Sequence, residues 1–174
     1  MSATPNAARA EIVHPPKRAT GTYILFTLTA ALTAASAAFA TASLGWAPWI
    51  MFMGWVAYFT RPNLADGLQS FACAVIGLTL GALATVAIGE LSPILGPAAL
   101  PAVVFTVACL VIAMRGLPAL SNLLGYFIGL ITFFAAHREP TAGTVATLAA
   151  AIAIGFTAGF VAQQIEAAIR KRFG

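Results

Sequence analysis

The chain has 174 residues, of which 60% are hydrophobic and only 8% charged, with nine Lys and Arg against five Asp and Glu. Soluble domains carry about 25% charged residues, so this composition excludes a soluble globular domain and also a disordered or fibrous chain. It predicts a polytopic membrane protein whose main partner is the lipid bilayer, and its basic net charge does not require a nucleic-acid partner.

Apolar segments without charged residues follow one another along the chain, and each is a candidate transmembrane helix because a span needs about 20 apolar residues. In chain order they are residues 23–44, 46–60, 67–89, 97–114, 117–136 and 141–165. They are continuously apolar and rich in Ala and Leu, without the alternation of a β-barrel strand. The predicted fold is therefore all-α, with six transmembrane helices.

The second segment is short for a span. As a helix, residues 46–60 reach only about 22 Å against a hydrocarbon core of about 30 Å, which leaves a tilted span or a re-entrant hairpin. With six full spans, every Lys and Arg except Arg138 lies on the cytoplasmic side, as the positive-inside rule expects. Re-entrant second and fifth segments would place Arg61 and Arg115 outside as well. We therefore predict six spans with both termini in the cytoplasm.

The N-terminal region has two readings. Lys17 and Arg18, the apolar run after them and Ala-Phe-Ala at residues 38–40 resemble a cleavable signal peptide. We instead expect the first helix to be retained, because the repeat described next needs it. Residues 1–20 are polar and contain three prolines, and we expect a disordered cytoplasmic tail.

The two halves of the chain resemble each other. Residues 52–59 align with 127–134 through Phe-x-Gly followed by two aromatic residues, and residues 76–84 align with 154–162 through Ile-Gly, Thr and a second Gly. Chance matches are easy in an Ala-, Leu- and Gly-rich chain, but two matches in the same order favour a true repeat. Because each copy holds three spans, the copies must be inverted in the membrane.

This repeat defines the predicted organisation. The predicted units are the tail 1–20, the first repeat 21–90, the second repeat 91–166 and a basic cytoplasmic tail 167–174. Glycine pairs four residues apart provide small faces for close helix packing, which we prefer to contact with a solute. These packing residues are Gly77, Gly81, Gly125, Gly129, Gly155 and Gly159. We expect the third and sixth helices to cross near the pseudo-axis or to dimerise.

No ionisable residue lies deep within a predicted span, which argues against a proton relay or an ion site. A pathway here would be lined by aromatic, hydroxyl and backbone groups. The candidate lining residues are Phe52, Trp55, Tyr58, Phe59, Asn122, Phe127, Phe133 and Phe134. Aromatic residues in spans more often pack or face lipid, and an amide such as Asn122 more often bonds to a neighbouring helix. Aromatic rings could also form a constriction that gates by dewetting.

Enzymatic chemistry has little basis in this sequence. Cys73 and Cys109 lie in separate spans without a second ligand nearby, so we predict no metal site. There is no phosphate-binding loop, nucleophile motif or carboxylate pair, and we predict neither a cofactor nor an enzyme. A lipid-directed enzyme is the weakest alternative, since only residues 137–139 gather polar groups at one interface.

Several motifs resemble those of a bacterial inner-membrane family of unknown function, the YcdZ-like proteins. They are Trp-Ala-Pro at residues 46–48, Gly-Trp-Val-Ala-Tyr-Phe at 54–59, Gly67 and, in the second half, Phe-Ile-Gly at 127–129 with the glycine-rich sixth helix. The likeness covers residues 22–164. The long N-terminal tail and Arg-Pro-Asn at 61–63 depart from it. The resemblance implies a multi-pass protein of the bacterial inner membrane and supplies no activity or catalytic residue.

Two functions are predicted. The first is a channel or transporter for a small neutral solute, through a pathway between the inverted repeats. The alternative is a structural or partner-binding membrane protein, and a homo-oligomer is compatible with both. A continuous polar cavity between the second and fifth helices would favour transport, whereas a packed interior would favour the structural role.

Overall fold

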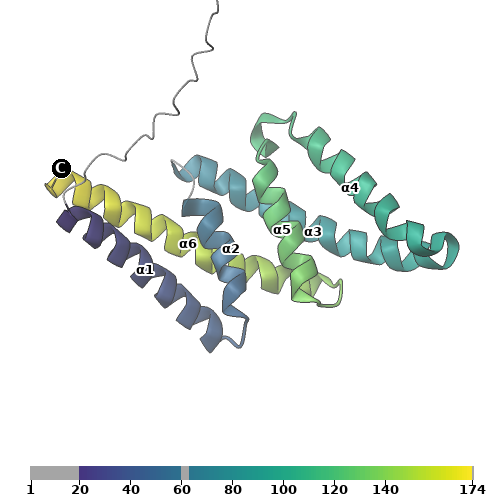
Figure 1. Ribbon diagram of the computed structural model, residues 1–174, viewed down its shortest axis with the longest axis horizontal. Coiled ribbons are helices and arrows are strands. Elements are labelled where there is room, and N and C mark those ends of the chain that lie inside the picture. The colour runs from purple at the N-terminus through teal and green to yellow at the C-terminus, as the bar shows by residue number, and fades with distance from the viewer. Residues whose placement is uncertain (1–19, 60–62, 174) are drawn as a thin grey trace, which may run out of the picture.

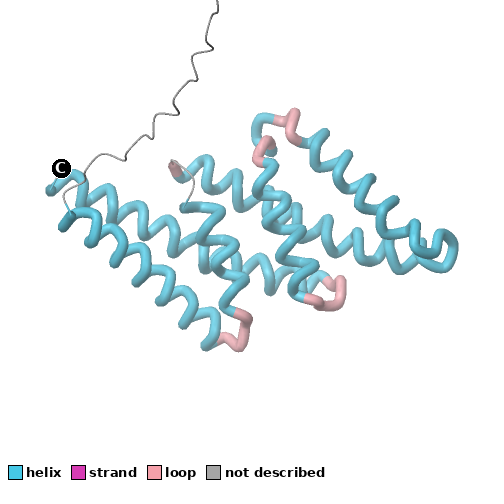
Figure 2. The backbone as a smooth tube through the Cα atoms, viewed as in Figure 1, coloured by secondary structure: helices cyan, strands magenta, loops and turns pink. Residues whose placement is uncertain are grey.

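The computed structural model describes residues 20–59 and 63–173, and the elements within these ranges are all helical (Figures 1 and 2). The all-α prediction is confirmed for this part of the chain. The helices are α1 (Thr20–Ser43), α2 (Pro48–Phe59), α3 (Leu64–Leu95), α4 (Ala99–Met114), α5 (Leu123–Ala136) and α6 (Ala142–Phe173), with 3-10 turns at Gly96–Ala98 and Pro118–Leu120. Residues 1–19 of the predicted tail, and with them Arg9, Lys17 and Arg18, lie outside the described residues, as does Arg61.

The third helix is longer than predicted. It begins at a cap in which the Asn63 side chain accepts a hydrogen bond from the Asp66 amide at 2.9 Å. It then continues past Glu90 to Leu95, because one exposed carboxylate does not interrupt backbone hydrogen bonding. The helix ends where Gly96 adopts a positive φ of 53°, a conformation that glycine reaches without steric cost. The predicted end at residue 89 is therefore wrong.

The fifth helix is shorter than predicted. Residues 118–120 form a 3-10 turn, and α5 begins only at Leu123. The cause is Asn122, whose side chain accepts a hydrogen bond from the Gly125 amide at 3.2 Å and so caps the helix. At the other end of the chain, α6 continues through Arg170, Lys171 and Arg172, so the predicted basic tail forms its last turns.

Three helical stretches within the described residues are long and apolar enough to cross a membrane: Gly21–Ser43, Leu64–Met114 and Ala142–Arg172. The second of these contains both α3 and α4, which fold back on each other (Figure 1). The stretches indicate a membrane protein. Helices α2 and α5 are also apolar, but with 12 and 14 residues they reach only roughly 18 and 21 Å. Six full spans therefore remain a prediction.

The helices form two packed groups. Figure 1 shows α1, α2 and α6 together on one side and α3, α4 and α5 on the other, and the contacts between elements agree with this division. Helix α2 packs on α6, and α5 packs on α3, although each member of these pairs comes from a different half of the chain. The two groups meet where α3 contacts α6 and α2 contacts α5.

Candidate functional site

Helix α2 lies directly on α6, and three glycines make this approach possible. A Cβ atom added at Gly54 would collide with the carbonyl of Ile152, and one added at Gly155 would collide with the carbonyl of Met51. At Gly159 the added atom would lie 3.1 Å from the carbonyl oxygen of Trp55. The two backbones are therefore in contact along this face, as small-residue interfaces in membranes allow.

Helix α5 lies on α3 in the same manner. A Cβ atom at Gly129 would collide with the carbonyl of Ala74, and one at Gly77 would collide with the carbonyl of Tyr126. At Gly81 the nearest atom would be the Cβ of Phe133, 2.8 Å away, and at Gly125 the Cβ of Cys73 and the carbonyl oxygen of Ser70 would both lie 2.7 Å away. The glycine faces of α3 and α6 therefore pack against the short helices rather than against each other.

The two contacts use corresponding residues of the aligned halves. Gly54 of α2 aligns with Gly129 of α5, and Gly77 and Gly81 of α3 align with Gly155 and Gly159 of α6. Each short helix thus packs against the glycine pair of the long helix from the other half, and its own aligned glycine lies in the same contact. In Figure 1 the counterparts also run in opposite directions, α2 against α5 and α3 against α6.

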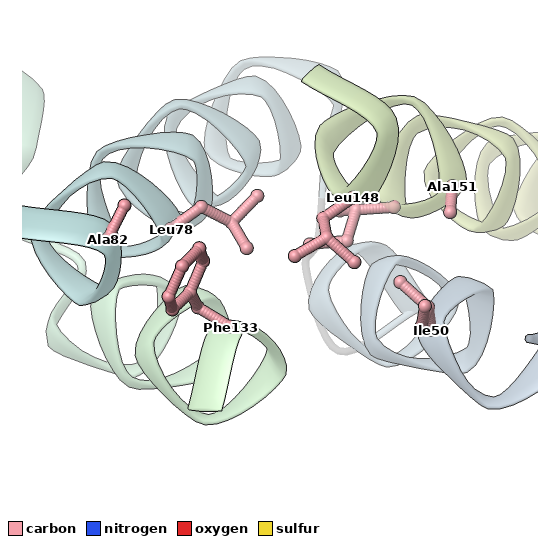
Figure 3. Packing of buried hydrophobic residues seen from close by; sticks show 7 residues of the cluster. Ile50, Leu78, Ala82, Phe133, Leu148 and Ala151 are labelled. Atoms are coloured by element: carbon pink, nitrogen blue, oxygen red, sulfur yellow. The ribbon is translucent and has the colours of Figure 1, made fainter. Parts of the chain in front are cut away.

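Where the two groups meet, the centre is filled by apolar side chains (Figure 3). Leu78 and Phe133 come from α3 and α5, while Leu148 and Ile50 come from α6 and α2. Figure 3 shows Leu78 pointing toward Leu148 across the junction. We call the whole set the central cluster, and it consists of Ile50, Leu78, Ala82, Phe133, Leu148, Ala151 and Ile152.

Three of the candidate aromatic residues of α2 pack against α6 or against each other. Tyr58 is 1% exposed and meets the rings of Phe156 and Phe160 edge to face, with centroids 4.7 and 5.8 Å apart. Trp55 stacks on Phe59 with centroids 4.5 Å apart. The two Tyr58 contacts fasten the C-terminal half of α2 to α6.

The remaining candidates lie in different places. Phe52, Phe127 and Phe134 are exposed at 43%, 43% and 42%, the first on α2 and the other two on α5. Phe133 belongs to the central cluster, and Asn122 is the buried cap of α5. The structure therefore does not bring the candidate lining residues into one ring.

Two glutamines that the sequence analysis did not single out bind the ends of short helical elements. The Gln163 side chain of α6 donates to the carbonyls of Phe59 and Tyr58 at 3.2 and 3.5 Å, at the end of α2. The Gln69 side chain of α3 donates to the Pro118 carbonyl at 2.6 Å and the Ser121 hydroxyl at 3.2 Å, just before α5. In the sequence, both could have been found as carboxamides within otherwise apolar segments, because a carboxamide in lipid requires a hydrogen-bond partner.

Charged side chains stay away from the central cluster. In the described part of the chain they lie at helix ends, in loops and on exposed faces. Glu166 and Arg170 pair at 3.5 Å near the end of α6, and the Arg170 guanidinium lies 5.4 Å from the centre of the Phe26 ring. Within residues 20–59 and 63–173, no three His, Cys, Asp or Glu residues gather as metal ligands.

Residues 27–167 match the protein family described as "Protein of unknown function (DUF1097)". The chain belongs to this family. The match includes both glycine contacts, the central cluster and both glutamines. No curated protein and no solved structure matched the chain.

This DUF1097 protein is accordingly a helical membrane protein of an uncharacterised family. The narrower resemblance to YcdZ-like proteins remains a prediction. The family description supplies no activity, and the distinctive features of this chain are the paired glycine contacts, the central cluster and the helix-end glutamines.

Proposed function

We propose that this protein is a small membrane channel or transporter for a neutral solute, with its pathway between two inverted three-helix repeats. The observation that carries the proposal is the reciprocal seating of the short helices, α2 on α6 and α5 on α3, through aligned glycines. Inverted repeats commonly form a pathway at their junction, because the same structure then faces both sides of the membrane.

The length of the short helices supports a pathway rather than packing alone. A helix of 12 or 14 residues, α2 or α5, reaches less than the hydrocarbon core of about 30 Å. At least one end of each then lies inside the membrane, where its backbone carbonyl or amide groups need partners. Gln163 meets this need at the end of α2, and Gln69 binds the turn before α5. These ends are the polar positions from which a neutral solute could gain hydrogen bonds.

The central cluster acts in this proposal as the gate. Its members are hydrocarbon side chains that meet from both repeats, with Leu78 opposite Leu148 (Figure 3). A constriction of this kind excludes water until the helices move apart. It contains no charged group, which favours a neutral solute over an ion.

We place the protein in the bacterial inner membrane with both termini in the cytoplasm. Arg170, Lys171 and Arg172 at the end of α6 and Arg115 after α4 support this orientation, since basic residues favour the cytoplasmic side. A homo-oligomer is compatible with this arrangement.

Flux through proteoliposomes tests the proposal. The protein is reconstituted and challenged with water, polyols, small amides and short acids, alongside the double variant Leu78→Ala/Leu148→Ala. Opening the gate should raise the flux of one or more neutral solutes by roughly tenfold or more, because two buried side chains no longer fill the constriction. The variant Leu83→Ala, on an exposed position of α3, should leave flux unchanged. If neither protein nor gate variant moves any solute faster than empty vesicles, the proposal fails.

A structural or partner-binding role is the second candidate, and the tightly filled centre favours it. The central cluster leaves the junction between α2 and α5 packed with apolar side chains, as a static scaffold would require. The same experiment separates the two roles. A scaffold predicts that Leu78→Ala/Leu148→Ala lowers stability without creating flux.

A further inference from the structure

Helix α4 is held differently from α1, its counterpart in the other packed group. Helix α1 contacts both α6 and α2, and the turn after it is tied back by hydrogen bonds from the Leu44 and Trp46 amides to the Thr41 carbonyl, at 3.2 and 3.1 Å. Helix α4 contacts α3 but barely touches α5. The reason is that the connection between α4 and α5, residues 115–122, is longer than the connection between α1 and α2, residues 44–47. It contains a 3-10 turn that separates the end of α4 from the start of α5.

This separation leaves a crevice of about 420 Å³ bounded by α3, α4 and α5. Ala84 lines it from α3, Val107, Ala108 and Val111 from α4, and Leu130 and Phe134 from α5. The crevice walls are hydrocarbon, so water gains no hydrogen bonds there. Its volume lies in the range of about 300–1,000 Å³ found for small-molecule sites.

The crevice is continuous with the surface that these helices present to lipid. Val104 on α4 and Ile131 on α5 both line it and are both 54% exposed, so they form its open rim. The stretch Leu64–Met114, which supplies two of its three walls, is apolar and long enough to lie within the membrane. The molecules available at that rim are therefore the acyl chains of the bilayer.

We propose that the crevice between α4 and α5 binds one acyl chain of a membrane lipid. A flexible unbranched chain can enter a space that three helices enclose and hydrocarbon side chains line, and such chains surround this part of the protein in the membrane. The bound chain lies between α4 and α5, whereas α1 and α2 contact each other directly in the other group. The site does not depend on solute transport.

Photolabelling in a lipid bilayer tests this site. The full chain is reconstituted in phosphatidylcholine with a trace of the same lipid carrying a diazirine midway along one acyl chain. Irradiation should label Val111 and Leu130, which are only 1% and 9% exposed and which face the crevice. Lipid that stays outside the crevice would label exposed Phe105 and spare these two residues.

Matched variants show whether the label arrives through the crevice. Ala108→Trp fills it and should reduce labelling of Leu130 by at least about fivefold, while Cys109→Trp adds the same bulk to the exposed side of α4 and should not. Ala135→Phe fills the crevice from α5 and should act like Ala108→Trp if that variant folds poorly. The proposal is overturned if the unaltered protein is labelled at Phe105 but not at Leu130 and Val111, as when α4 closes on α5 or another protein copy covers the rim. It is also overturned if the filling variants leave Leu130 labelling unchanged.

Discussion

At the scale of single residues, the absence of a Cβ atom decides how closely the helices approach. Gly54 and Gly155 bring α2 and α6 into backbone contact, and Gly77 and Gly129 do the same for α3 and α5. At each of these positions even the smallest side chain would meet a carbonyl of the facing helix. In lipid, where apolar burial adds little, such close contacts supply much of the attraction between helices.

Gly155→Ala should therefore loosen α2 from α6. The added methyl group forces the backbones apart, and we expect a loss of about 1–3 kcal/mol in the free energy of unfolding. Unfolding with SDS in mixed micelles, followed by circular dichroism, measures the change. Gly89→Ala is the matched control, because nothing lies within 4 Å of a Cβ at Gly89. For Gly89→Ala we expect the free energy of unfolding to rise by about 0.5–1 kcal/mol, because Ala has a higher helix propensity than Gly. Equal effects at the two positions would contradict the role assigned to Gly155.

At the scale of the elements, side-chain amides bind the polar ends of several helices. Asn63 and Asn122 cap the starts of α3 and α5, and Gln163 binds carbonyls at the end of α2. A carbonyl without a partner in the membrane is costly, so a side chain from a neighbouring helix that reaches it stabilises both elements.

Gln163→Leu should weaken the hold of α6 on α2. Leu has a similar size to Gln but cannot donate a hydrogen bond to the Phe59 carbonyl. We therefore expect the free energy of unfolding to fall by about 1–3 kcal/mol. Gln164→Leu, on the exposed side of the same helix, should have little effect. The same SDS titration compares the two variants, and a loss of stability confined to Gln164→Leu would refute the assignment.

The apolar segments could be read from the sequence, because runs of apolar residues determine where helices form in a membrane. Their ends could not, because these depend on local geometry: Gly96 stops α3 beyond Glu90, and Asn122 delays the start of α5. The aligned glycines could be recognised as a repeated pattern in the sequence. The pattern did not indicate which pairs of helices they bring together. The different exposures of the aromatic candidates could not be read from their spacing: Phe52 and Phe134 are exposed, while Phe133 is buried.

At the scale of the whole molecule, two groups of three helices share one apolar junction. Each group combines helices from both halves of the chain, so neither half is complete without the other. The predicted orientation follows from the arrangement of charges around these groups, and it specifies on which side of the membrane each loop lies.

Cysteine labelling in whole cells tests that orientation. In a Cys109→Ala background, where Cys73 is buried, we expect His137→Cys to react with an impermeant maleimide from outside. Gly116→Cys and Ala168→Cys should react only after the membrane is permeabilised, because both lie beside cytoplasmic basic residues in the predicted topology. Labelling of Gly116→Cys and His137→Cys from the same side would rule out a full span between them.

The seating of α2 on α6 also sets the order in which the protein can be completed during synthesis. Helix α2 leaves the ribosome long before α6, the element that receives its Gly54 face. Until the last helix is inserted, that face has no native neighbour, so final folding depends on contacts far apart in the chain and should be slow. A chain that stops before Gly155 would leave α2 in the bilayer without its docking surface. We expect the proteases that remove misfolded membrane proteins to degrade such a chain.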